Sequence, residues 1–176
     1  NAGADAYNVA VGYNAGKEVT TGIENTIVGG LAGDALTTGS YNIAIGQLAL
    51  STEDGGSKSI AIGKNALRLQ NNDGDNYNIG IGHSAGENIT TGVENVLIGA
   101  LAGDALTTGH YNVAIGTRAL STEDGHGYCV AIGRDALKNQ NAGANAYNVA
   151  MGYQAGLSVT TGIVNTIVGG LAADAL

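Results

Sequence analysis

The apolar positions of the chain follow one short pattern that recurs from end to end. Each copy has a β-branched residue, a middle residue that is usually small, an apolar residue and a closing glycine, as in IAIG (43–46) and VAIG (113–116). The ten closing glycines, called anchor glycines below, are Gly12, Gly29, Gly46, Gly63, Gly82, Gly99, Gly116, Gly133, Gly152 and Gly169. They lie 17, 17, 17 and 19 residues apart, and this series then repeats. Self-similarity at a short fixed period predicts a solenoid of stacked units, here called rungs, with four rungs in a 70-residue super-repeat.

The three residues before each anchor glycine predict a short β-strand, because side chains alternate between the two faces of a strand. The outer two residues are apolar or β-branched in every rung, and we expect them to face the core. The middle residue is small in seven rungs, but it is Ile27, Leu97 and Ile167 once in each super-repeat. This schedule indicates that the middle face is buried too. We expect it to form an alanine-rich seam against a partner chain.

The second half of the rung comes in two types. The third residue after the anchor glycine is always alanine, and the fourth is typically glycine in one type and leucine in the other. Rungs of the glycine type carry an aliphatic residue three positions later, at Val19, Leu36, Ile89, Leu106, Val159 and Leu176. Rungs of the leucine type continue into polar loops such as STEDGG (51–56) and STEDGHG (121–127). We expect both types to fill one core slot from different positions.

An asparagine stands four residues before the anchor glycine in eight rungs. These residues are Asn8, Asn25, Asn42, Asn78, Asn95, Asn112, Asn148 and Asn165, and Ser59 and Cys129 take the place in the other two rungs. Stacked asparagines can form hydrogen bonds along a ladder, and asparagine tolerates turn conformations. The column therefore predicts a structural ladder.

Together these patterns predict an all-β fold, a parallel β-solenoid or β-roll of about ten rungs of 17–19 residues, in the shape of a rod. Ten rungs at a strand spacing of about 4.8 Å would measure about 48 Å. The chain reads as one repeat array over 1–176, with super-repeats at 6–75 and 76–145 and a partial one at 146–176. Because it starts and ends inside the array with no visible capping unit, we expect a segment of a longer fibre. The pattern leaves open the handedness of the coil and whether each coil has two sides or three.

Composition narrows the function classes. The chain has 30 glycines, no proline, tryptophan or phenylalanine, and a net charge of −8. Without a Lys/Arg cluster to neutralise phosphates, nucleic acid is not an expected partner. No apolar run approaches the roughly 20 residues of a membrane span, so membrane insertion is not expected either. No signal peptide is visible. A single cysteine, Cys129, excludes an internal disulfide framework.

The residues that could carry chemistry do not form a recognisable catalytic pattern. His83, His110 and His126 fall in different columns of the repeat, so no shared row of metal ligands is expected. His126 follows Glu123 and Asp124 in a glycine-rich loop, for which a plain surface loop is favoured over a metal site. The pairs Glu53–Asp54 and Glu123–Asp124 are expected to be solvated, and Cys129 reads as a structural substitution in the Asn column. We predict no enzymatic activity, no catalytic or metal-binding residues and no cofactor.

One further segment has a calcium-loop appearance, NNDGDN at 71–76. Its counterparts in the other super-repeats, NAGADA at 1–6 and NAGANA at 141–146, lose most of the carboxylates. A repeated calcium site would keep them, so a plain turn is favoured.

Units of the form N-T/V-A-I-G-x-x-A-L, followed by a polar stretch and TTG, resemble the repeat regions of phage and prophage tail-fibre proteins. YNIAIGQLAL (41–50) and YNVAIGTRAL (111–120) carry this resemblance, which covers essentially the whole chain. Tail fibres of this kind often end in a self-cleaving chaperone domain of the endosialidase type. KSIAIG (58–63) and YCVAIG (128–133) are also similar to the head repeats of trimeric autotransporter adhesins, which are left-handed parallel β-rolls built from three chains.

The resemblance implies a non-enzymatic structural segment of a phage tail fibre, located in the virion. Its expected partners are two further copies in a parallel homotrimer, other tail or baseplate proteins, and a host-surface receptor such as a glycan or an outer-membrane component. If the segment itself touches the host, the polar loops 51–57, 69–76, 121–127 and 139–146 are the candidates.

Three alternatives remain open. A bacterial trimeric surface adhesin would share the architecture at the cell surface. An ice-binding solenoid could use regular threonine rows, supplied here by Thr20, Thr21, Thr37, Thr38, Thr90 and Thr91. The loop-bearing rungs interrupt those rows, which disfavours a flat lattice-matching face. A polysaccharide hydrolase is less favoured still, because no acid/base pair stands out.

Overall fold

The computed structural model describes residues 5–174, and these form a β-solenoid with one short strand in each rung. The strands are β1 (Val9–Val11), β2 (Thr26–Val28), β3 (Ile43–Ile45), β4 (Ile60–Ile62), β5 (Ile79–Ile81), β6 (Val96–Ile98), β7 (Val113–Ile115), β8 (Val130–Ile132), β9 (Val149–Met151) and β10 (Thr166–Val168). They make one ten-stranded parallel sheet in sequence order. Each strand aligns residue for residue with the next, which confirms the 17- and 19-residue register.

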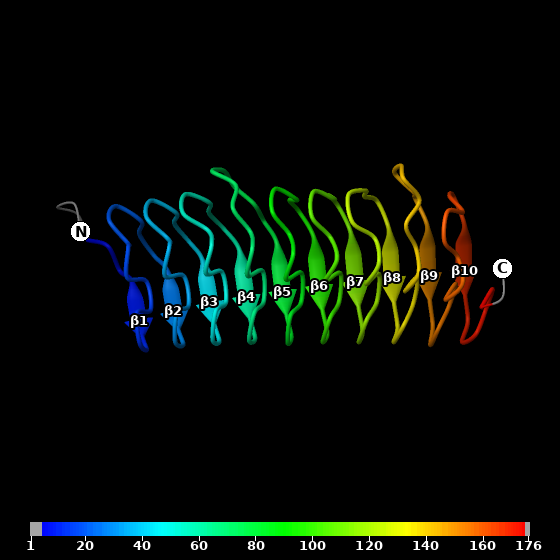
Figure 1. Cartoon of the computed structure of the whole chain (residues 1–176), viewed down its shortest axis with the longest axis horizontal. Coiled ribbons are helices and arrows are strands. Elements are labelled where there is room, and N and C mark those ends of the chain that lie inside the picture. The colour runs from blue at the N-terminus through cyan, green and yellow to red at the C-terminus, as the bar shows by residue number, and fades with distance from the viewer. Residues whose placement is uncertain (1–4, 175–176) are drawn as a thin grey trace.

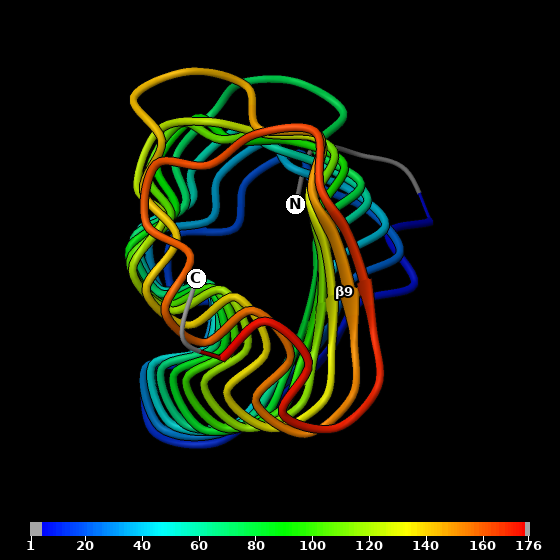
Figure 2. The ribbon, with the colours of Figure 1, turned by 90° about the vertical axis from the view of Figure 1, so that its right-hand side faces the viewer.

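The sheet runs along the length of the molecule, and each coil returns through turns on the opposite side (Figures 1 and 2). The coil is therefore neither a two-stranded nor a three-stranded one: a single strand forms one wall and turns form the rest. The connections from β4 to β5 and from β8 to β9 project beyond the others at one corner (Figure 1). These two connections contain the segments 69–76 and 139–146, where the spacing of anchor glycines rises from 17 to 19 residues.

Backbone hydrogen bonds join successive rungs outside the sheet as well. The Leu48 N–H donates to the Gly30 carbonyl at 3.1 Å, and the Tyr41 N–H donates to the Ile23 carbonyl at 3.0 Å. Both donors have positive φ, 59° for Leu48 and 62° for Tyr41, and equivalent residues of the other rungs do the same. The bond of the Leu48 kind recurs in every following rung and the bond of the Tyr41 kind in most of them. The turns therefore keep their left-handed residues although leucine and tyrosine disfavour that conformation.

The structure reverses the expected faces of the strands. The middle residues point into the coil and are buried, Ile27 and Leu97 as well as the alanines at 44, 61, 114, 131 and 150. The outer residues of each strand are half-buried or exposed on the outside. The prediction that the valines and isoleucines face the core was therefore wrong, as was an alanine seam between chains. The reason is the narrow coil: a methyl group added at Gly80 would lie 2.7 Å from Leu67 Cγ on the opposite wall.

Aliphatic side chains from the second half of the rung lie in the core in both rung types. Leu50, Leu67, Leu120 and Leu137 are buried in rungs of the leucine type, and Leu36, Ile89, Leu106 and Val159 are buried in rungs of the glycine type. The strands with a large middle residue lie beside rungs that have glycine as the fourth residue after the anchor glycine. A Cβ at Gly86 or Gly103 would lie 2.6 or 2.7 Å from a methyl carbon of Leu97. Leu176 and residues 1–4 of the segment NAGADA lie outside the described residues.

The asparagine ladder is confirmed and has two kinds of bond. The Asn25 side chain accepts from the Asn42 N–H through Oδ1 and donates from Nδ2 to the Gly39 carbonyl, both at 2.9 Å. The same two bonds recur at Asn8, Asn42, Asn78, Asn95, Asn112 and Asn148. Each buried amide thus satisfies one backbone donor and one backbone acceptor of neighbouring coils.

Candidate functional site

The first candidate site is the outside of the sheet, called the outward face below. It consists of the first and third residues of all ten strands, which are twenty positions in two straight rows. Eighteen are Val, Ile or Met, the other two are Thr26 and Thr166, and none is charged. The exposed fraction reaches 36% at Ile45 and 37% at Met151, and it rises to 59% at Val11 and 68% at Val168 in the terminal strands. The solenoid therefore presents a long apolar strip that its own chain does not cover.

A column of exposed tyrosines borders the outward face. Tyr41, Tyr77, Tyr111, Tyr128 and Tyr147 each stand two residues before their strand and are 42–52% exposed. The rings of Tyr128 and Tyr147 stack with centroids 5.0 Å apart, and the ring of Tyr111 lies tilted against Tyr128 at 5.1 Å. In the rung between Tyr41 and Tyr77 the column holds Lys58, whose ammonium donates to Tyr77 at 3.0 Å and to Asp75 at 2.6 Å. The same column holds Glu24, Glu94 and Val164, so the border mixes aromatic, charged and aliphatic side chains.

The second candidate site is inside the coil, in the first pair of loop-bearing rungs. Glu53 is fully buried, and its carboxylate accepts from the Gly56 N–H at 2.7 Å, from Gln70 Nε2 at 2.9 Å and from Asn76 Nδ2 at 3.0 Å. The Asn72 N–H adds a longer bond of 3.4 Å. Four donors surround this anion, so its buried charge is compensated by hydrogen bonds rather than by a counter-ion.

Gln70 connects this buried acid to the asparagine ladder. Its Nε2 also donates to Ser59 Oγ at 2.9 Å, and its Oε1 accepts from Asn78 Nδ2 at 2.9 Å. Ser59 occupies the Asn column, so Gln70 supplies the side-chain amide at the level where the ladder lacks one. The result is a closed polar network inside an otherwise apolar core.

The expectation that Glu53 and Glu123 are solvated was wrong, since both are fully buried; Asp54 is half-buried and Asp124 is exposed. The sequence does contain the signal. Glu53, Gln70, Glu123 and Gln140 are each the seventh residue after an anchor glycine, the position of Val19, Leu36, Ile89 and Leu106 in the other rungs. A column position that faces the core in those rungs faces the core in the loop-bearing ones too.

Burial should make Glu53 a source of pH-dependent stability. Desolvation raises the pKa of Glu53 above its ordinary value of 4.5, against the opposing hydrogen bonds from Gln70, Gly56 and Asn72. The folded chain then binds more protons than the unfolded chain between the two pKa values, so the Glu53 contribution to the free energy of unfolding falls as pH rises through that interval. Urea unfolding from pH 4 to pH 7 should show this fall in the native chain and not in Glu53→Gln. Parallel pH profiles of the two chains would contradict it.

The second loop-bearing pair repeats the buried acid with different neighbours. Glu123 Oε1 lies 3.2 Å from both the backbone N and the Nδ1 of His126, and one ligand atom each of Glu123, Asp124 and His126 lies within 4.8 Å of the others. The other two histidines lie elsewhere. His83 is exposed, and His110 accepts from the Val93 N–H at 3.0 Å through Nδ1. The structure thus brings together one histidine with the two acids that precede it.

Cys129 and the calcium-like segment offer no comparable arrangement. Cys129 is buried, and burial raises the pKa of its thiol to about 11, which keeps it in the unreactive thiol form at neutral pH. In the segment 71–76, the Asp75 carboxylate is paired with Lys58, and Asn72 Nδ2 donates to Asn76 Oδ1 at 2.7 Å. This segment is a hydrogen-bonded turn that encloses Asn76.

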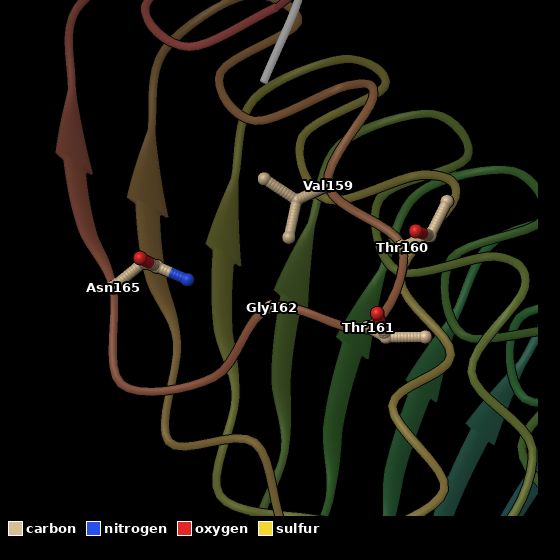
Figure 3. A pocket seen from close by; sticks show the side chains of 5 residues that line it. All are labelled: Val159, Thr160, Thr161, Gly162 and Asn165. Carbon is tan, nitrogen blue, oxygen red and sulfur yellow. The ribbon is translucent and has the colours of Figure 1, made fainter.

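A shallow pocket lies at the level of β10, lined by Val159, Thr160, Thr161, Gly162 and Asn165 (Figure 3). In earlier coils the equivalent surface is covered by the next rung; for example, the Gly109 carbonyl accepts from Asn95. The lining offers two threonine hydroxyls and one amide but no ionisable group. It is the uncovered edge of a coil rather than a site with its own chemistry.

Comparison with models of protein families, with curated proteins and with solved structures finds no match to this chain. Within residues 5–174 there is no helix of the length and apolar character needed to span a bilayer.

Proposed function

We propose that the chain is a non-enzymatic structural segment of a fibre in which three parallel copies associate through their outward faces. The observation that carries this proposal is the uncovered sheet: twenty positions without a charge, in a chain that has 22 charged residues elsewhere. Nine strand spacings of about 4.8 Å make the strip roughly 43 Å long, and two side-chain rows make it roughly 10 Å wide. About 400 Å² of contiguous apolar surface is typical of an interaction site.

The composition of the strip and its border suits a partner chain. Tyrosine is enriched at protein interfaces, because its ring buries apolar area while its hydroxyl stays hydrated, and Tyr41, Tyr77 and Tyr111 stand in this position along the edge. A second copy of the same chain offers the matching surface with the same 4.8 Å repeat. Cyclic closure around an axis parallel to the rod would cover every strip without leaving an open end. The number three comes from the resemblance to tail fibres and adhesins.

Within a phage tail fibre, such a segment would space the host-binding part from the particle and connect to other tail or baseplate proteins. The loops 69–76 and 139–146 project farthest from the coil (Figure 1) and are the proposed contacts to a host glycan or outer-membrane component. The loops 51–57 and 121–127 follow the coil and bury Glu53 and Glu123, so they are assigned a structural part instead.

A bacterial trimeric adhesin is the alternative context for the same assembly. The threonine rows give little support to the ice-binding alternative. The hydroxyls of Thr20, Thr37 and Thr90 donate to carbonyl groups of the following rung at 3.1–3.2 Å, so their donors are engaged within the chain. The loops at 51–57 and 121–127 also interrupt both rows.

Light scattering after size exclusion tests the proposal. The native chain is expected to elute with the mass of a trimer, and the double variant Ile81→Lys, Ile98→Lys is expected to be a monomer with unchanged β-sheet circular dichroism. Two desolvated ammonium groups on adjacent strands would oppose association, while a lone chain leaves them in water. The matched control, Thr91→Lys with Thr108→Lys, adds the same charge at exposed corner positions and should stay trimeric.

A monomeric native chain would refute the assembly. So would a lysine variant that keeps the native mass. A monomer that depresses the growth of ice by thermal hysteresis would move the ice-binding alternative to the front.

A further inference from the structure

The same loop occurs twice in the chain, and the two copies treat their buried acid differently. STEDGGSKS (51–59) and STEDGHGYC (121–129) share their first five residues and occupy the same place in the super-repeat. In the first copy the Glu53 carboxylate accepts four hydrogen bonds. The first copy therefore shows the hydrogen bonds that this acid makes when all its donors are present.

The second copy has lost donors to its acid. Ala146 stands where Asn76 donates in the first copy, and Cys129 stands where Ser59 accepts from Gln70. Glu123 Oε2 and Gln140 Nε2 are both buried and have no hydrogen-bond partner among the described residues. A buried carboxylate with fewer donors than that of Glu53 is costly, so a cation that compensates its charge would be favoured.

The second copy has also gained an imidazole. His126 replaces Gly56 of the first copy. A Cβ at Gly56 would overlap Asn76 Nδ2, so a residue larger than glycine fits here only where the asparagine is replaced, as it is by Ala146. His126 is half-buried and its Nδ1 faces Glu123 Oε1 at 3.2 Å. Asp124, which is exposed, brings a third ligand atom to within 4.8 Å of the other two and leaves the cluster open to solvent on one side.

We propose that Glu123, Asp124 and His126 bind a divalent transition-metal ion of the zinc class, each through one ligand atom. Two carboxylates neutralise a divalent charge, and an imidazole selects first-row transition ions over calcium or magnesium. Water would complete the coordination on the open side. The first copy binds no such ion, because Gln70, Asn76, Gly56 and Asn72 already occupy the Glu53 carboxylate and no histidine is present.

The ion would hold the loop 121–127 to the coil as the amides hold 51–57. This inference does not depend on the number of chains in the fibre. The ligands all come from one chain, and they lie on a loop rather than on the outward face.

Isothermal titration of the full, tag-free chain with zinc chloride tests the site. We expect one equivalent per chain, with the dissociation constant raised at least tenfold in His126→Gly, a variant that restores the residue found at Gly56 and so should fold. His83→Ala, which removes an exposed histidine elsewhere, should bind as the native chain does, and so should the monomeric variant Ile81→Lys, Ile98→Lys. Cobalt in place of zinc should give visible d–d bands that Asp124→Asn or Glu123→Gln weakens.

Absence of saturable binding would overturn the proposal. So would binding that His126→Gly leaves unchanged, which would mean that His126 only fills the space of the missing amide and hydrogen-bonds to Glu123. Zinc bound through scattered surface histidines would instead be weakened by His83→Ala. None of these outcomes alters the light-scattering test of the trimer, so the two proposals fail independently.

Discussion

Replacing Gly99 by alanine is expected to lower the free energy of unfolding by about 3 kcal/mol or more. Gly99 has a φ of +133°, a region that residues with a Cβ rarely enter. An added Cβ would also lie 2.6 Å from the carbonyl carbon and 2.7 Å from the carbonyl oxygen of Gly116 in the next rung. The obstacle is backbone, so relief requires the two rungs to move apart and lengthen their hydrogen bonds.

Gly30→Ala is the matched control. Gly30 follows an anchor glycine directly, and nothing lies within 4 Å of the position its Cβ would take. The variant should differ from the native chain by no more than about 0.5 kcal/mol. Urea unfolding followed by circular dichroism would measure both variants. Equal midpoints would show that the anchor glycines are not required by the stacking.

Leu97→Ala is expected to destabilise the chain by about 2–5 kcal/mol. Leu97 is fully buried, and its methyl carbons fill the space that Gly86 and Gly103 leave open. Its neighbours in the same inner row are Gly80 and Ala114, which are too small to close over a cavity. The cavity would also span two rungs, so neither can collapse into it alone.

Two comparisons sharpen this prediction in the same unfolding assay. Leu97→Ile conserves volume and should lose less than about 1.5 kcal/mol. Thr117→Ala removes an exposed side chain in the next rung and should be nearly neutral. A Leu97→Ala chain as stable as the Thr117→Ala chain would mean that the inner row does not support the fold.

The sequence predicts the period, the strands and the asparagine ladder, because each depends on a spacing that recurs in at least eight of the ten rungs. The prediction of which strand face is buried was wrong. Valine and isoleucine at the first and third strand positions are typical of core residues, but here they lie on the outside. The structure resolves this through volume: the inner row has glycine at position 80, where an added Cβ would overlap Leu67, and it holds Leu97 beside Gly86 and Gly103. In the sequence, a large middle strand residue goes with glycine at the fourth position after the anchor glycine of the preceding rung. This correlation in size indicates that the middle residue faces the inside of the coil.

The candidate sites were harder to foresee for a related reason. Glu123 reads as part of a polar loop when its neighbours along the chain are considered, and as a core residue when its column is considered. Its loss of partners depends on Ala146 and Cys129, which lie 23 and 6 residues away along the chain. These positions approach the Glu123 carboxylate only because the coils stack. The missing hydrogen bonds of Glu123 therefore follow from the three-dimensional structure and not from its neighbours in sequence.

Each strand contacts only the strands before and after it, so a load along the axis passes through the rungs in series. When one 17-residue rung opens, its chain can extend to roughly 56–61 Å, while the rod loses only about 4.8 Å of stacked length. A rod pulled from its end would therefore hold its length up to a threshold force. Beyond that force its end-to-end length would increase by roughly 50 Å for each rung that opens. Under sudden tension it would act as a shock absorber, giving way one coil at a time while the remaining coils stay intact.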